Sequence, residues 1–281
     1  MLVSVTSYSF LRWIKKGLET DLSIIKIAKD MGFDAIEFST LNVPEGKTKE
    51  EWATMLAEEA KKQDLKVICY SVGGNLITGD LKEQVETLKQ EVDIAAILGA
   101  SLMRHDIGYT FPHTVSFAAE TEKFCEAIRE VADYAKTKGV KTMSENHGRY
   151  YQDIDRVEEV YYTVNHENYG VLIDIGNFLC ADVDPSYAVG RLAKTATHVH
   201  LKDFLKKPII GKEQPAGWIV TRGGNALRGT VLGDGVVPLA SCLYALKFGG
   251  YNGYLTVEFE GPEEIDYALT TALKRVRALI N

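Results

Sequence analysis

The alternation of short apolar strands with amphipathic helices is the feature that most constrains the fold of this chain. Apolar residues recur at helical spacing from Ile24 to Met31, and Gly32 then ends the predicted helix. Gly99 and Gly139 end two further helices of the same kind, each shortly before a strand. The predicted strands are Leu2–Ser7, Ala35–Ser39, Lys66–Ser71, Ser101–His105, Lys141–Glu145, Gly170–Asp174, His198–Leu201 and Tyr254–Glu258.

The number of strand–helix units predicts an α/β fold with a closed barrel. The chain has 281 residues, and about 250 residues are typical of a (β/α)8 TIM barrel. No linker or shift in composition divides it, so we expect a single TIM barrel domain over residues 1–281. A doubly wound open sheet is the alternative. Its first turn is often rich in glycine, whereas Thr6-Ser7-Tyr8-Ser9 occupy that turn here.

Composition and charge exclude several classes of partner. The chain has 39 acidic and 32 basic residues, a formal net charge of -7, and no basic block. We therefore expect no nucleic-acid partner. The N-terminus does not resemble a signal peptide and no stretch is long enough to span a bilayer, which predicts no membrane partner. The four cysteines show no CxxC pairing, as in a reducing compartment, so we expect a cytoplasmic protein.

Residues 204–237 form the longest stretch without a clear helix or strand pattern, and they are rich in glycine. Loops of this length are usually functional or disordered. The segment follows the seventh predicted strand and carries Trp218, Arg222 and Arg228. We expect it to form a lid over the substrate, with a decorative insertion or an oligomer contact as the alternative.

Four ionisable residues close apolar strands and mark the candidate site. They are Glu145 in KTMSENHG, Asp174 in GVLIDIGN, His200 in THVHLKDF and Glu258 in YLTVEFEG. Side chains alternate across a strand, and this phase directs Glu145, His200 and Glu258 into the barrel. Strands five to eight are neighbours in a closed barrel, and the active sites of TIM barrels lie where the strands end. We therefore expect the four side chains to converge.

Three carboxylates and one imidazole at one point predict a site for one divalent cation. Such a set suits Mn²⁺, Mg²⁺ or Co²⁺ better than structural Zn²⁺, which favours cysteine and histidine, although Zn²⁺ stays an option. A single carboxylate at a strand end is more often a helix cap or an ion-pair partner. Four such residues in phase on consecutive strands favour the metal site.

The order of these motifs resembles the xylose isomerase-like TIM barrel superfamily, over essentially the whole chain. The ENHG and HVHLKD segments are most similar to the branch of sugar and sugar phosphate isomerases and epimerases. The resemblance implies that Glu145, Asp174, His200 and Glu258 bind the metal. It also implies that Glu145 and Glu258 transfer protons on opposite faces of a carbohydrate substrate, next to its carbonyl, through an enediolate.

The chain departs from the ketose epimerases of that superfamily at three positions. Their second substrate-binding glutamate, six residues after the first, is replaced by Tyr151. A histidine three residues after their aspartate ligand is replaced by Asn177, and an arginine six residues after their histidine ligand by Lys206. These departures affect the choice of substrate and leave the predicted metal ligands intact.

Several further residues are candidates for the site. We expect His147, on the inward face beside Glu145, to act as an acid or base. The alternative for His147 is a core hydrogen bond, and for Lys202 it is an ion pair with Asp203 or Glu260. His113 and His166 are expected to be surface residues. The candidates for substrate binding are Tyr8, Tyr70, Arg104, His105, Asn177, Lys202 and Glu260.

The predicted reaction is thus that of a metal-dependent isomerase or epimerase of sugars, sugar phosphates or polyols. A lyase such as an inosose-type dehydratase on the same metal platform is the alternative. An endonuclease IV-like phosphodiesterase is disfavoured, because Asn177 and Gly233-Asp234-Gly235 lack the histidines of a trinuclear zinc site. A barrel that binds a ligand without catalysis is disfavoured by the intact ligand set. The metal, the phosphorylation of the substrate and association into a homo-oligomer stay open.

Overall fold

The computed structural model describes residues 1–109, 116–149, 151–209, 214 and 216–280. Eight parallel strands close into a barrel in the order β1-β11-β7-β6-β5-β4-β3-β2. The predicted TIM barrel is therefore confirmed, and each βα unit places its strand beside the previous one. The barrel strands are β1 (Leu2–Thr6), β2 (Ala35–Ser39), β3 (Lys66–Val72), β4 (Leu102–His105), β5 (Lys141–Glu145), β6 (Tyr169–Asp174), β7 (Ala196–Leu201) and β11 (Tyr254–Val257).

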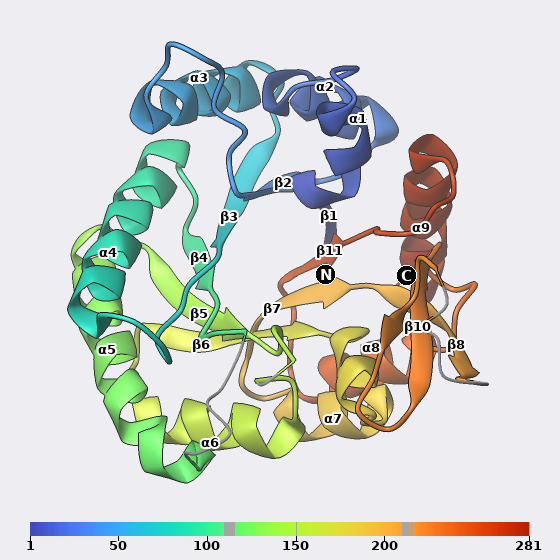
Figure 1. Ribbon diagram of the computed structural model, residues 1–281. Helices are drawn as coiled ribbons and strands as arrows, with labels where there is room; N and C mark the ends of the chain where they lie inside the picture. The colour runs from blue at the N-terminus through green and yellow to red at the C-terminus, as the bar shows by residue number, and fades with distance from the viewer. Residues whose placement is uncertain (110–115, 150, 210–213, 215, 281) are drawn as a thin grey trace.

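Helices surround the ring of strands (Figure 1). Their buried faces carry the apolar residues that recur at helical spacing, such as Val85, Leu88 and Val92 in α4. The helices are α1 (Leu11–Lys15), α2 (Asp21–Met31), α3 (Lys49–Lys62), α4 (Leu81–Leu98), α5 (Phe117–Thr137), α6 (Ile154–Val164), α7 (Pro185–Leu192), α8 (Leu239–Phe248) and α9 (Ile265–Ile280), with 3-10 helices η1 (Ser7–Phe10) and η2 (Asn177–Ala181).

Local sequence signals set the helix ends. The side chain of Thr20 accepts a hydrogen bond from the Ser23 backbone, and Ser23 returns one, which forms a capping box at the start of α2. The C-caps Gly32 and Gly99 have φ angles of 93° and 73°. Glycine adopts this left-handed conformation at little cost, so these positions end α2 and α4 as the sequence predicts.

The barrel interior is divided into an apolar floor and a polar upper part. The floor consists of Ala35, Ile68, Cys69, Met143 and Leu172, a separate buried cluster with Leu102 and Tyr254 packed against it. Because strand side chains alternate, residues two positions further along β2, β5 and β6 point into the same space. Those positions are Glu37, Glu145 and Asp174.

Residues 204–237 are more regular than the sequence suggested. They contribute to a three-stranded antiparallel sheet of β8 (Asp203–Pro208), β10 (Asn225–Thr230) and β9 (Ile219–Val220). The glycines obscured this pattern. Gly229 lies in β10, and a Cβ there would come within 2.7 Å of the Glu260 side chain, so the close approach requires glycine. Residues 210–213 and 215 of this segment, like His113, lie outside the described residues. Among the described residues, no helix is long and apolar enough to cross a membrane.

Candidate active site

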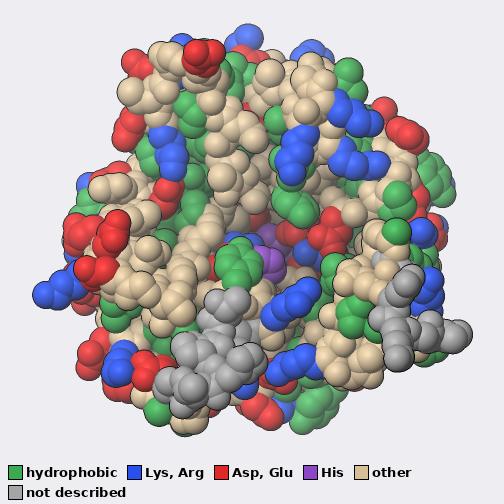
Figure 2. All heavy atoms as spheres, in the orientation of Figure 1, with side chains coloured by type: hydrophobic (Ala, Val, Ile, Leu, Met, Phe, Trp, Pro, Cys, Tyr) green, Lys and Arg blue, Asp and Glu red, His purple; other side chains and the backbone are tan. Residues whose placement is uncertain are grey.

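The four strand-end residues converge at one end of the barrel. Oxygen or nitrogen atoms of Glu145, Asp174, His200 and Glu258 all lie within 4.8 Å of one another. The first three are at most 1% exposed, and the side chain of Glu258 is 11% exposed. Figure 2 shows the hollow in this face, with histidine, acidic and basic side chains gathered in it. We call these four residues the carboxylate cage.

Backbone and amide groups fix the cage residues on β5 and β6. The Asn146 side chain donates to the carbonyl of Asp174 and accepts from its backbone N–H, at 2.9 and 2.8 Å, which ties the ends of the two strands together. Oδ1 of Asp174 accepts from the N–H of Gly176 at 2.8 Å. Asn177 donates to Oε1 of Glu145 at 2.9 Å. One oxygen of each carboxylate is thus held by hydrogen bonds, and the other lies within ion-pair distance of Arg104 or Lys202.

Two cations, the buried Lys202 and the partly buried Arg104, balance the charge of the cage. Arg104 forms ion pairs with Glu145 and with Asp106, the latter at 3.2 Å. Lys202 Nζ lies 2.7 Å from Glu258 Oε1 and 3.2 Å from Asp174 Oδ2. Burial acts to lower the pKa of Lys202, but the neighbouring carboxylates outweigh it and raise that pKa. Both side chains are therefore charged inside the barrel.

The donor atoms fit a divalent cation. Glu145 Oε2, Asp174 Oδ2 and His200 Nδ1 are buried atoms that make no hydrogen bond. Each lies within ion-pair distance of a charged neighbour, but none of these neighbours is its hydrogen-bond partner. Buried polar atoms are rarely left in this state. Three oxygen donors and an imidazole nitrogen turned toward one point are the set that Mn²⁺ or Mg²⁺ takes.

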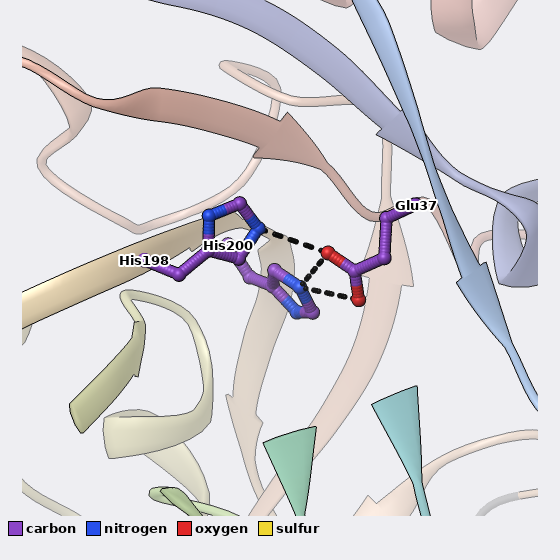
Figure 3. Close-up of side chains that lie close together, drawn as sticks. All are labelled: Glu37, His198 and His200. Carbon is purple, nitrogen blue, oxygen red and sulfur yellow. Dashed lines mark hydrogen bonds and ion pairs between the residues drawn. The ribbon is translucent and has the colours of Figure 1, made fainter. Parts of the chain in front are cut away.

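A buried carboxylate that we did not predict lies behind His200. Glu37 of β2 is fully buried, and its carboxylate contacts Nε2 of His200 at 3.0 Å and Nε2 of His198 at 2.9 Å (Figure 3). Ser71 donates to it at 2.6 Å. Burial acts to raise the pKa of Glu37, but the charge of His200 and the hydrogen bonds of both imidazoles outweigh it and lower that pKa. A single glutamate in the apolar run AIEFS was the signal that could have identified it.

His147 and Asp106 form an acid–base pair beside the cage. Nδ1 of His147 lies 2.9 Å from Oδ1 of Asp106, and the Tyr109 hydroxyl donates to the other oxygen of Asp106. Burial lowers the pKa of His147, but the bond to Asp106 and the charge of Glu145 outweigh it, so the pKa lies above 6.5. The Asp106 hydrogen bond leaves Nε2 of His147 as the ring nitrogen for a reactant.

A cavity of about 470 Å³ opens from the cage toward solvent. This volume is in the range of small-molecule sites. Of the substrate-binding candidates, Tyr8, Arg104, Lys202 and Glu260 line it together with His147. Asn177 lines an adjoining cavity of about 250 Å³. The structure brings these residues together around the cage.

Two of the substrate-binding candidates, Tyr70 and His105, do not line the cavity of about 470 Å³. On β3 the inward positions are Cys69 and Ser71, so Tyr70 points outward and its hydroxyl donates to Glu91 of α4 at 2.9 Å. On β4 Arg104 points inward, and the side chain of His105 is fully buried on the opposite face. Outside the irregularity at Ile68, where the register of β2 and β3 shifts, the alternation of side chains directs only one of two consecutive residues into the barrel interior.

The positions that depart from the epimerase pattern have different surroundings. Tyr151 is fully buried in the main hydrophobic core. Lys206 is exposed on β8. Asn177 is buried and contacts both Glu145 and Lys202, at 2.9 and 3.4 Å. Of these three positions, only Asn177 therefore lies at the cage.

The sequence of this chain matches one family model and is similar to several curated proteins. The family model described as xylose isomerase-like TIM barrel matches residues 25–279. Among curated proteins, inosose dehydratase from Clostridium perfringens (strain 13 / Type A) is 26% identical over 158 residues, which cover 55% of this chain and 52% of that protein. The chain thus aligns with about half the length of this relative.

Two solved structures show the same fold. The IolI protein with a bound zinc atom superposes with a TM-score of 0.77 at 20% identity, over 100% of this chain and 98% of its own. D-psicose 3-epimerase from Clostridium cellulolyticum H10, in complex with D-tagatose, superposes with a TM-score of 0.75 at 18% identity, over all of both chains. At these identities the likeness establishes the fold.

Proposed function

This chain belongs to the xylose isomerase-like TIM barrel family, and on that basis we propose that it is a divalent-metal-dependent lyase acting on a polyhydroxylated ketone. The reaction removes a proton from the carbon next to the carbonyl, and a hydroxyl on the following carbon leaves as water. The carboxylate cage beside the His147–Asp106 pair is the observation that carries the proposal. Inosose dehydratase, a relative of this chain, is named for a reaction of this class.

The metal would be held by Glu145, Asp174, His200 and Glu258. When bound, a divalent cation supplies an electrophile that polarises the substrate carbonyl and stabilises the negative charge that develops on its oxygen. The remaining chemistry is that of protein side chains around the cavity. Arg104 holds Glu145 in place through their ion pair.

His147 is the proposed base. Asp106 accepts from Nδ1–H, so Nε2 carries a lone pair and takes the proton from carbon. The electron pair of that C–H bond forms the enolate. When the electron pair returns, the bond to the hydroxyl on the next carbon breaks and the carbonyl is restored. Lys202, an ammonium that lines the same cavity, donates the proton that turns the leaving hydroxyl into water.

Epimerisation or isomerisation is the second candidate. It is supported by the two glutamates of the cage, Glu145 and Glu258, which can exchange protons with a bound ketone from two strands of the barrel. The fold shared with D-psicose 3-epimerase is compatible with it. The pairing of Glu258 with Lys202 at 2.7 Å favours the lyase, because it reduces the basicity of that glutamate.

Proton NMR in D₂O separates these reactions. The metal-loaded protein is incubated with a panel of inososes, ketohexoses and their phosphates. The lyase proposal predicts loss of water and an unsaturated or diketone product. Exchange of the proton next to the carbonyl without loss of water would support the second candidate instead. Neither exchange nor turnover with the whole panel, for protein shown to carry metal, would contradict both.

A further inference from the structure

We infer that Glu37 is the positioning residue of the metal centre: its carboxylate holds the imidazole of His200 so that Nδ1 faces the carboxylate cage. The inference rests on the proposed metal-dependent function and assigns a role to a residue outside the predicted ligand set. Glu37 lies on β2, two strands beyond β11 along the barrel, whereas His200 lies on β7. The contact therefore spans the barrel interior.

The two ring nitrogens of His200 have different partners. Nε2 lies 3.0 and 3.1 Å from the two oxygens of Glu37. Nδ1 lies 2.7 Å from Glu258 and 3.9 Å from Glu145, on the side of the cage. A carboxylate accepts hydrogen bonds and cannot donate them, so Nε2 must carry the proton. A metal in the cage displaces any proton on Nδ1, and the proton held on Nε2 then leaves the lone pair of Nδ1 for the metal.

Glu37 is itself rigidly held. The Ser71 hydroxyl donates to Oε1 at 2.6 Å, and His198 contacts Oε2 at 2.9 Å. Thr256 contacts Nε2 of His198 at 2.9 Å. Burying a carboxylate without such partners is costly, and the contacts of Glu37 with Ser71, His198 and His200 offset that cost. The carboxylate is therefore fixed before any ligand binds, as Figure 3 shows for its two imidazole contacts.

The contacts between the Glu37 carboxylate and the two imidazoles do not favour a second metal between these three residues. The separations of 2.9 to 3.1 Å between oxygen and nitrogen are those of direct hydrogen bonds. A metal there would take Nε2 of His200 while Nδ1 faces the cage, and the ring would have to lose both protons. Hydrogen bonding explains the geometry without this requirement.

Metal titration of Glu37→Gln tests the inference without relying on turnover. The amide has nearly the same shape, but it can donate to Nε2 and so favour the wrong tautomer. Loss of such a partner weakens metal binding by about 10- to 100-fold. We expect a loss of this size for Zn²⁺ in calorimetry. Ser71→Ala is the matched control, because it removes one bond to Glu37 and keeps the carboxylate, and its affinity should stay close to wild type.

The outcomes separate this inference from the proposed function. A wild-type protein that binds no divalent ion overturns the metal centre itself. A wild type that binds Zn²⁺, with Glu37→Gln of equal affinity and equal folding by circular dichroism, overturns only the role of Glu37. If the variant does not fold, ¹⁵N NMR of the zinc-loaded wild type decides. A proton on Nε2 of His200 supports the inference, and a proton on Nδ1 contradicts it.

Discussion

The ammonium nitrogen of Lys202 lies 2.7 Å from Oε1 of Glu258, so a side-chain cation already shares the carboxylates of the cage. It also lies 3.2 Å from Asp174. Lys202 follows His200 at the next inward position of the same segment, so the fold itself directs the lysine to this point. A metal ion and the ammonium are like charges that use the same oxygens.

Lys202→Met should therefore separate metal binding from catalysis. The side chains have similar length, and the substitution removes the competing charge. We expect Mn²⁺ to bind more tightly than in wild type, while turnover falls by at least about 100-fold because the proton donor is lost. Calorimetry and steady-state kinetics measure the two effects. Lys206→Met, on the exposed part of β8, is the control. Weaker metal binding in Lys202→Met would contradict this account.

Replacement of His147 should affect turnover and spare the metal. His147→Gln removes the proposed base, and loss of a general base typically lowers kcat by about 10²- to 10⁴-fold. Asp106→Asn retains the imidazole but changes the partner of Nδ1, so we expect a smaller loss. Metal affinity should remain near the wild-type value in His147→Gln. Wild-type rates of substrate deuteration in that variant would show that another group removes the proton.

Metal binding should weaken as the pH falls through about 6. Burial raises the pKa of Asp174 to about 6; Lys202 opposes this effect, and Glu145 and Glu258 add to it. Below this value a proton competes with the metal for Asp174. We expect affinity to fall by roughly tenfold per pH unit there for each proton displaced. An affinity that stays constant between pH 7.5 and pH 5 would contradict the prediction.

The same pKa has a consequence for the metal-free protein. A carboxyl whose pKa is raised by folding stabilises the folded state fully at pH values below 3.8, its pKa in the unfolded chain. This contribution is lost as the pH rises through about 6. Bound metal replaces the proton at higher pH. The increase in Tm on adding Mn²⁺ should therefore be larger at pH 7.5 than at pH 5.5. Equal increases would indicate that Asp174 does not contact the ion.

The fold and the convergence of the cage could be predicted from local sequence patterns. Strand alternation and the order of strands were enough to bring Glu145, Asp174, His200 and Glu258 together, because neighbouring parallel strands end at the same side of the barrel. Gly32 and Gly99 marked helix ends through a conformation that glycine adopts readily. These signals depend only on residues close together in the chain.

Contacts across the barrel could not be predicted in this way. Glu37 lies 163 positions from His200 in the chain, and no local pattern indicates which of its neighbours it meets inside the barrel. The phase of β3 and β4 places Tyr70 and His105, two substrate-binding candidates, away from the cavity at the cage. The antiparallel sheet of residues 203–230 was obscured by glycines that close packing requires.

The metal content of the purified protein tests the central claim most directly. Wild-type protein, Asp174→Asn and Lys206→Met are each loaded with Mn²⁺ and dialysed. Their manganese content per chain is then measured by inductively coupled plasma mass spectrometry. Our account predicts about one ion per chain in wild type and Lys206→Met, and a large loss in Asp174→Asn, whose fold is checked by circular dichroism. Wild-type protein that retains no stoichiometric ion, or folded Asp174→Asn that retains as much as wild type, would contradict it.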